Sequence, residues 1–224
     1  GKDYVNPGSL ILSAEIPTRL TDAEFWQLIQ NVSEPDGTFR TDNLLSNEMV
    51  FARLLPELTA QTKPGGVYLG VGPEQNFTYI VGMKAKMAFI TDIRRENLHL
   101  LLMYKALFEM SKDRAEFISL LFTKPRPPGL SATSTIPEIM NAFWNVPTAD
   151  EAVYDANLAA IHRHLTQTRK PPLPQSDIAG VTAVYRAFYF YGPAMNYSAS
   201  LSLLNIGGGG ATYKDLMAQT DSKG

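Results

Sequence analysis

The stretch VYLGVGPEQNF, residues 67–77, joins an apolar run to a Gly-x-Gly turn, and MAFITDIRREN, residues 87–97, repeats an apolar run and ends it at Asp92. A near-continuous apolar run is typical of a strand that a parallel sheet buries on both faces. The segment between the two runs has apolar residues at helical spacing, and residues 94–110 form a longer amphipathic pattern. The order strand, helix, strand, helix predicts a right-handed parallel βαβ unit.

This unit leads us to expect an α/β fold, with a Rossmann-like parallel sheet and many flanking helices. Only two strands are convincing, however, and two strands do not make a stable sheet. Helical patterns fill the segments KDRAEFISLLF, IPEIMNAFWNV, ADEAVYDANLAAIHRHLTQT and SDIAGVTAVYRAFYFYG. We therefore expect the missing strands either in the last third of the chain or, as we prefer, in residues after Gly224 that complete the sheet.

Helix signals also precede the βαβ unit. Thr21 and Glu24 have the spacing of a capping box at the start of an amphipathic segment. Ser46 is a good N-cap for a second helix, and Pro56 within that segment is expected to kink or split it. The two segments predict a helical cap before the first strand.

Composition restricts the function classes. The 224 residues are 45% hydrophobic and carry a net charge of −2, which fits a soluble globular protein. We expect no nucleic-acid partner because no basic stripe is present, and no membrane partner because no apolar run reaches the length of a span. No signal peptide is visible, so we expect a cytoplasmic protein. The absence of cysteine excludes disulfides, thiol catalysis and cysteine zinc sites.

The Gly-x-Gly turn and the acid after the second strand have the chemistry of a nucleoside site. Gly70 and Gly72 let a ligand approach the backbone at a helix start. Asp92 follows Gly70 by 22 residues, close to the spacing expected of an acid that accepts the ribose hydroxyls. A dinucleotide fingerprint needs a third glycine where this chain has Gln75, and Glu74 would repel a phosphate. A phosphate-free ligand, S-adenosylmethionine, fits better.

The same residues also allow a purely structural interpretation. The glycines would then form a tight turn between buried elements, and Asp92 would cap the following helix. Spacing alone does not decide between the two interpretations.

The blocks GVGPEQNFTYI and KMAFITDIRRENL resemble an uncharacterised bacterial family with a class I S-adenosylmethionine-dependent methyltransferase-like Rossmann domain. FRTDNLLSNE and YKDLMAQTDSKG are similar to that family too, so the resemblance runs from about Ile16 to the C-terminus. It implies that Gly70 and Gly72 lie in the glycine-rich loop and that Asp92 binds the ribose. It also implies further strand-forming segments after this C-terminus.

The expected organisation is one methyltransferase-like domain over residues 1–224. Within it we expect a helical cap at about 17–63, a cofactor-binding βαβ unit at about 66–110, a helical region at 111–192 and a tail at 193–224. The candidate cofactor-binding residues are Gly70, Gly72, Glu74, Asn76, Asp92, Ile93, Ser46, Asn47 and Glu48.

The last three of these candidates have two interpretations. Ser46, Asn47 and Glu48 could bind the amino-acid end of the cofactor, or could simply cap a helix, which the pattern favours. Arg94 and Arg95 could bind an anionic substrate, but solvated charges paired with Glu96 are the more common arrangement.

Histidines and aromatic residues supply the remaining candidates. His162 and His164 face different sides of a helix and cannot chelate one metal together, so we expect no metal site. Tyr185 and Phe188 are expected in the core, whereas Tyr189 and Tyr191 are the better candidates for a pocket wall.

The leading functional hypothesis is an S-adenosylmethionine-binding, methyltransferase-like protein that takes a small-molecule ligand and has no identified acceptor. The alternative is a non-catalytic binding or structural module. An NAD(P)-dependent oxidoreductase is the third hypothesis, and Gln75 and Glu74 disfavour it.

Overall fold

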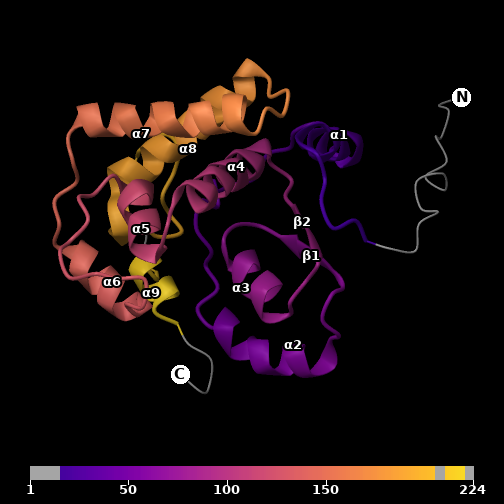
Figure 1. The fold of residues 1–224 in the computed structure, drawn as a ribbon, viewed down its shortest axis with the longest axis horizontal. Helices are drawn as coiled ribbons and strands as arrows, with labels where there is room; N and C mark the ends of the chain where they lie inside the picture. Colours follow the sequence, from indigo (N-terminus) through magenta and orange to yellow (C-terminus); the bar gives the residue numbers. More distant parts are fainter. Residues whose placement is uncertain (1–15, 205–209, 220–224) are drawn as a thin grey trace, which may run out of the picture.

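The computed structural model describes residues 16–204 and 210–219. Figure 1 shows two regions that α4 joins. One contains the small sheet together with α2 and α3, and the other is a larger assembly of helices. In chain order the elements are α1 (Asp22–Val32), η2 (Phe51–Leu54), α2 (Leu55–Gln61), β1 (Val67–Val71), α3 (Gln75–Gly82), β2 (Met87–Thr91), α4 (Arg95–Met110), α5 (Arg114–Phe122), α6 (Ile136–Trp144), α7 (Glu151–Arg163), η3 (His164–Thr168), α8 (Gln175–Tyr191), η4 (Gly192–Ala194) and α9 (Tyr213–Met217).

The βαβ unit forms as expected. β1 and β2 pair in parallel, with Val67 opposite Met87 and Val71 opposite Thr91, and α3 connects them. The register brings the ends of both strands to the same edge of the sheet.

The Rossmann-like α/β expectation is wrong. The described residues are 54% helical and their sheet has two strands, so the protein is a helical one with a minimal sheet. Val67, Leu69 and Val71 alternate along β1 and are 49%, 75% and 69% exposed. The expectation that β1 is buried on both faces is therefore wrong, because one of its faces is exposed. No described segment supplies a third strand.

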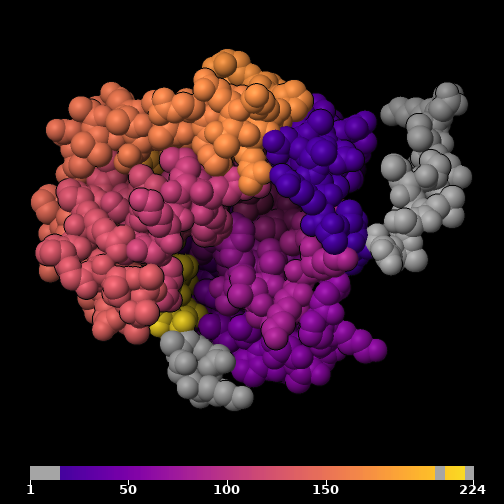
Figure 2. All heavy atoms as spheres, in the orientation of Figure 1, coloured from indigo at the N-terminus to yellow at the C-terminus, as the bar shows by residue number. Residues whose placement is uncertain are grey.

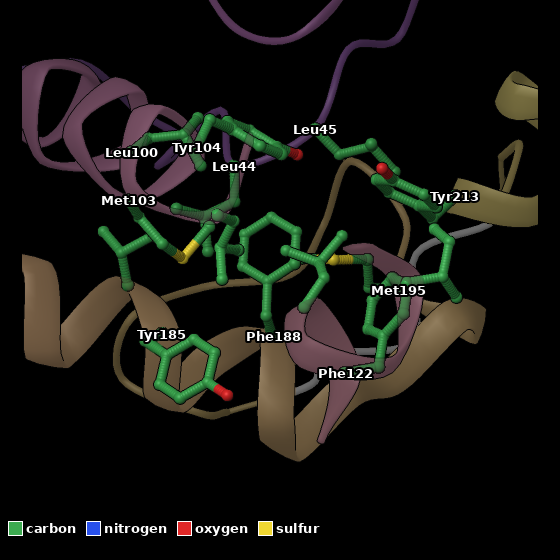
Figure 3. Packing of buried hydrophobic residues seen from close by; sticks show 14 of the residues in the cluster. Leu44, Leu45, Leu100, Met103, Tyr104, Phe122, Tyr185, Phe188, Met195 and Tyr213 are labelled. Carbon is green, nitrogen blue, oxygen red and sulfur yellow. The ribbon is translucent and has the colours of Figure 1, made fainter. Parts of the chain in front are cut away.

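The hydrophobic core lies in the helical region. Tyr185 and Phe188 of α8 are fully buried, which confirms their expected place, and they pack with Met103 and Tyr104 of α4 (Figure 3). Among the described helices, α4 and α8 pack against each other most extensively. The long amphipathic helix after β2 thus connects the sheet to the core.

A buried ion-pair cluster locks α4 to α8. Asp177, which is fully buried, accepts two hydrogen bonds of 2.7 Å from the Arg95 guanidinium and lies 2.9 Å from His99 Nε2. Burial alone raises the pKa of Asp177, but the bonds from Arg95 and His99 outweigh it and lower the pKa. Arg95 therefore pairs with Asp177 and not with Glu96, and Pro174 occupies the N-cap position of α8, which has no side-chain capping bond.

The N-terminal helices agree in part with their sequence signals. The Thr21–Glu24 capping box is present at α1. Pro56 lies in the first turn of α2 and separates it from the 3₁₀ helix η2, as its ring and missing N–H require. The second helical segment begins later than expected: residues 47–50 are exposed and lie outside any helix, and η2 starts at Phe51, so Ser46 is not its N-cap.

Candidate ligand site at the carboxyl ends of the strands

The turn after β1 is closed by protein atoms. Gly72 has a φ of 86°, which favours glycine, and its N–H donates to the Thr91 carbonyl at 3.1 Å. This bond extends the β1–β2 pairing and places Gly72 beside the end of β2, next to Asp92.

Gly70 is a glycine because side chains crowd it. A Cβ at this position would lie 2.0 Å from Asn76 Oδ1 and 2.5 Å from the Tyr68 ring. The Tyr68 hydroxyl donates to the same Asn76 oxygen at 2.7 Å. The space that a nucleotide fold leaves for a ligand is therefore filled here by two side chains.

Asn76 holds the turn together from inside. Its Nδ2 group lies within 2.8–3.1 Å of the carbonyl oxygens of Val71, Gly72 and Pro73. Asn76 is nearly fully buried, and both ends of its amide contact protein. These contacts give Asn76 a structural role in the turn.

Two of the predicted residues meet although they are far apart in the chain. Glu74 is buried, and both its carboxylate oxygens accept from the Ser46 N–H at 3.1 Å. Burial raises the pKa of Glu74 to about 7, against the lowering effect of backbone hydrogen bonds, including that from Ser46. Glu74 is the N-cap residue of α3, although its carboxylate makes no side-chain capping bond to that helix.

Three other candidate residues, Asn47, Glu48 and Ile93, are exposed at the surface. Asn47 and Glu48 are exposed, and the Glu48 N–H donates to Ser46 Oγ at 3.0 Å. Ile93 is 60% exposed, and its carbonyl accepts from the Gly37 N–H at 2.9 Å. The structure therefore brings Ser46 to Glu74 but leaves Asn47 and Glu48 at the surface.

Asp92 is engaged with Arg94, two residues on. Asp92 Oδ1 accepts from the Arg94 N–H at 2.9 Å, and Arg94 Nη2 donates to Oδ2 at 3.3 Å. Both side chains are about 95% buried, at 4% and 5% exposure. The first turn of α4 is capped instead from another loop, because Asp36 Oδ1 accepts from the Arg95 N–H at 2.8 Å.

Four buried polar atoms at this edge have no hydrogen-bond partner in the part of the chain that the structure describes. They are Gln75 Oε1, Arg94 Nε, Arg94 Nη1 and Asn97 Oδ1. Arg94 Nε remains within 3.3 Å of Asp92 Oδ1, which is an ion pair without hydrogen-bond geometry. Buried polar atoms are nearly always paired in native proteins, so such a group of exceptions requires an explanation.

The three residues that carry these atoms surround one turn. Gln75 Nε2 donates to the Val71 carbonyl at 3.3 Å, and Asn97 Nδ2 donates to the Gly72 carbonyl at 3.1 Å. Arg94 is tied to Asp92, which follows β2. The sequence favoured Arg94 as a solvated charge, with a substrate contact as the alternative. It gave no indication of Asn97, since a lone asparagine in an amphipathic helix has no distinguishing signal.

Larger hollows lie away from this edge. One, of about 310 Å³, is lined by Tyr191 with Lys124, Trp144 and the Gly192–Ala194 segment. Tyr189 instead directs its hydroxyl to the Ala149 carbonyl at 3.1 Å. Of the two predicted wall residues, Tyr191 lines this hollow and Tyr189 does not.

The family comparison matches residues 44–172 of the chain, more than half of its length, to a domain of unknown function, DUF7790. The chain belongs to the DUF7790 family. All nine candidate residues and the three residues with unpaired atoms fall within the DUF7790 match. Comparisons with curated proteins and with solved structures found no match.

Two kinds of feature are absent from the residues that the structure describes. In this part of the DUF7790 chain no helix is long and apolar enough to cross a membrane. No group of three or more histidine, aspartate or glutamate residues there has the arrangement of a metal site.

Proposed function

We propose that the carboxyl edge of β1 and β2 binds a small polar ligand and that this ligand is S-adenosylmethionine, the donor for methyl transfer. The observation that carries the proposal is the group of unpaired buried atoms on Gln75, Arg94 and Asn97. Unpaired polar groups at the carboxyl ends of parallel strands are the expected property of a ligand site.

The unpaired atoms have mixed character, which favours a zwitterion. Gln75 Oε1 and Asn97 Oδ1 need hydrogen-bond donors, whereas Arg94 Nη1 needs an acceptor. The amino-acid end of S-adenosylmethionine supplies an ammonium group and a carboxylate, and the ligand has no phosphate. An incoming carboxylate would pair with Arg94, and the ammonium group would donate to the two amide oxygens.

The ribose end requires a local exchange of partners. Asp92 accepts ribose hydroxyls only if Arg94 gives up its bond to Oδ2, which at 3.3 Å is long. The same ligand provides Arg94 with a new carboxylate partner, so the exchange leaves neither charge unpaired. Glu74, which is committed to Ser46, remains behind the turn and does not take part.

Calorimetric titration tests this proposal. Purified protein is titrated with S-adenosylmethionine, S-adenosylhomocysteine, NAD and NADP. We expect binding of the two sulfur nucleosides, and a loss of about tenfold or more in affinity for Asp92→Ala, equivalent to about 1.4 kcal/mol. NAD or NADP binding in their place would support the oxidoreductase alternative.

Asp150→Ala is the matched control. Asp150 Oδ1 accepts from the Val153 N–H at 3.1 Å at the start of α7, so its substitution also removes a hydrogen bond to a local backbone N–H. Asp150 lies on a different element from the proposed site, and the control should bind as the unmodified protein does. Absence of sulfur-nucleoside binding by folded protein would refute the proposal.

The second candidate function is a non-catalytic binding or structural module. It is favoured by the Asp92–Arg94 pair and by Tyr68 and Asn76, which fill the space over Gly70. In that case Asp92→Ala lowers the stability of the protein, and the four titrations show no heat of binding.

A further inference from the structure

A second hollow lies far from the turn and has a different character. It has a volume of about 530 Å³, within the range of small-molecule sites, and four segments line it. These are residues 17–25 before and within α1, the start of β2, the middle of α4 and the residue after η3. Figure 2 shows the indigo N-terminal segment against the orange end of α7 and η3.

The lining is predominantly basic. Arg19, Lys86, Lys105 and Arg169 line the hollow, and Asp22 is the one acidic side chain among its described lining residues. Phe25, Met87 and Leu20 add an apolar part. Four cations around one hollow repel each other, and an anion in the hollow would relieve that repulsion.

Two of the cations are held in place from behind. Glu109 accepts two bonds of 2.7 Å from the Arg169 guanidinium and one of 2.8 Å from Lys105 Nζ, and it lies 2.7 Å from His164 Nε2. Lys105 Nζ also lies 5.7 Å from the centre of the Phe25 ring. These contacts orient both cations before any ligand arrives, which reduces the entropy lost on binding.

The other two cations have no acidic partner. Arg19 and Lys86 are exposed, and neither forms an ion pair with a residue in the described ranges. Their charges are therefore not neutralised by the contacts that neutralise Lys105 and Arg169.

The backbone beside the hollow is unusual too. His164–Thr168 form a π-helix, and the Arg169 N–H donates to the His164 carbonyl at 3.0 Å. Such turns interrupt α-helices and are frequent at functional sites. Here the π-helix places His164 and Arg169 on the same carboxylate, Glu109.

We infer that this hollow binds a small multiply charged anion, with phosphate or carboxylate groups, through Arg19, Lys86, Lys105 and Arg169. The apolar residues would contact the body of the ligand. The site is independent of the proposed S-adenosylmethionine site, because the two share none of the residues argued for either.

Titration with inorganic pyrophosphate and with citrate tests the inference and separates the two kinds of anion. We expect one of them to bind, and the double substitution Arg19→Gln with Lys86→Gln to weaken that binding by about tenfold or more. Raising the salt concentration should weaken it as well, because exposed charges are screened. Since Arg19 and Lys86 make no ion pair with a described residue, the double variant should unfold at the same temperature as the unmodified protein.

Arg53→Gln with Lys63→Gln is the matched control. Both residues are exposed on or beside the η2–α2 segment and do not line the hollow, and the control removes the same two positive charges. Equal weakening by the control pair would show a general charge effect and overturn the site. Absence of binding of both anions would overturn it as well.

Discussion

At the residue scale, the most unusual group is the buried carboxyl of Glu74. The one Ser46 N–H, shared between both carboxylate oxygens, does not compensate for the loss of hydration of this carboxyl, so burial raises its pKa to about 7. Tyr104 of α4 and Tyr213 of α9 are the titratable groups that interact with it, and their own pKa values are raised by burial (Figure 3). Glu74 therefore titrates alone near neutral pH in a group whose other members stay uncharged.

This carboxyl makes stability depend on pH in a defined direction. Its folded-state pKa is above the ordinary value of 4.5 for a glutamate, so its proton stabilises the folded state below pH 4.5, and that contribution is lost as pH rises to about 7. The loss is about 3 kcal/mol for such a shift. We expect Glu74→Gln, which keeps an acceptor for Ser46, to gain stability relative to the unmodified protein above about pH 7.

Urea unfolding of both proteins across this pH range measures the difference. The two stabilities should converge as pH falls toward 4.5. Parallel stability curves would contradict the raised pKa.

At the element scale, the contact between α4 and α8 depends on one missing side chain. A Cβ on Gly180 would lie 2.1 Å from His99 Nδ1, and the His99 ring is held by Asp177. The two helices approach closely enough to bury Asp177 only because Gly180 leaves room for the imidazole. The cluster of Arg95, His99 and Asp177 and the glycine are thus parts of one contact.

We therefore expect Gly180→Ala to destabilise the protein, although the same substitution usually stabilises a helix. Alanine in a helix interior is normally more favourable than glycine by about 1 kcal/mol. Here we expect a loss of about 2 kcal/mol, because overpacking of a buried contact outweighs the helix preference.

A double-mutant cycle with His99→Ala isolates this contact. Removing the imidazole should make Gly180→Ala neutral or stabilising in the same urea unfolding experiment. An equal loss in both backgrounds would mean that His99 is not what Gly180 accommodates.

At the scale of the whole molecule, the two regions differ in where apolar residues are buried. Leu107 of α4 is fully buried, whereas Leu69 of β1 is 75% exposed. In a Rossmann-like sheet covered on both faces, β1 would be among the most buried segments. The helical assembly instead provides the core, and the sheet lies at its side (Figure 1).

The same substitution at these two leucines tests the arrangement. Leu107→Ala should cost about 3 kcal/mol through lost burial and the cavity that remains. Leu69→Ala should cost less than about 1 kcal/mol, because its side chain is largely in water already. Comparable losses measured by denaturant unfolding would indicate that the face of β1 is covered in solution.

Much of the local structure could be read from the chain. The strands at residues 67–71 and 87–91, the helix between them and the Thr21–Glu24 capping box follow from short-range rules of periodicity and hydrogen bonding. The candidate site is different: Gly70, Gly72 and Asp92 were located correctly at one edge, but not their partners. The contacts of Asn76 with Gly72 and of Arg94 with Asp92 were not read from the sequence, and neither was the bond from Ser46 to Glu74.

The sequence by itself determined which segments become helices and strands, because those preferences depend on residues within a few positions of one another. It also determined the parallel pairing of β1 and β2, since a short helical crossover permits little else. Tertiary structure alone decided that the helices rather than the sheet form the core, that Glu74 is buried against Ser46, and that four cations from separate segments surround one hollow. Burial and electrostatics depend on distances between segments remote in the chain, and only the folded arrangement sets those distances.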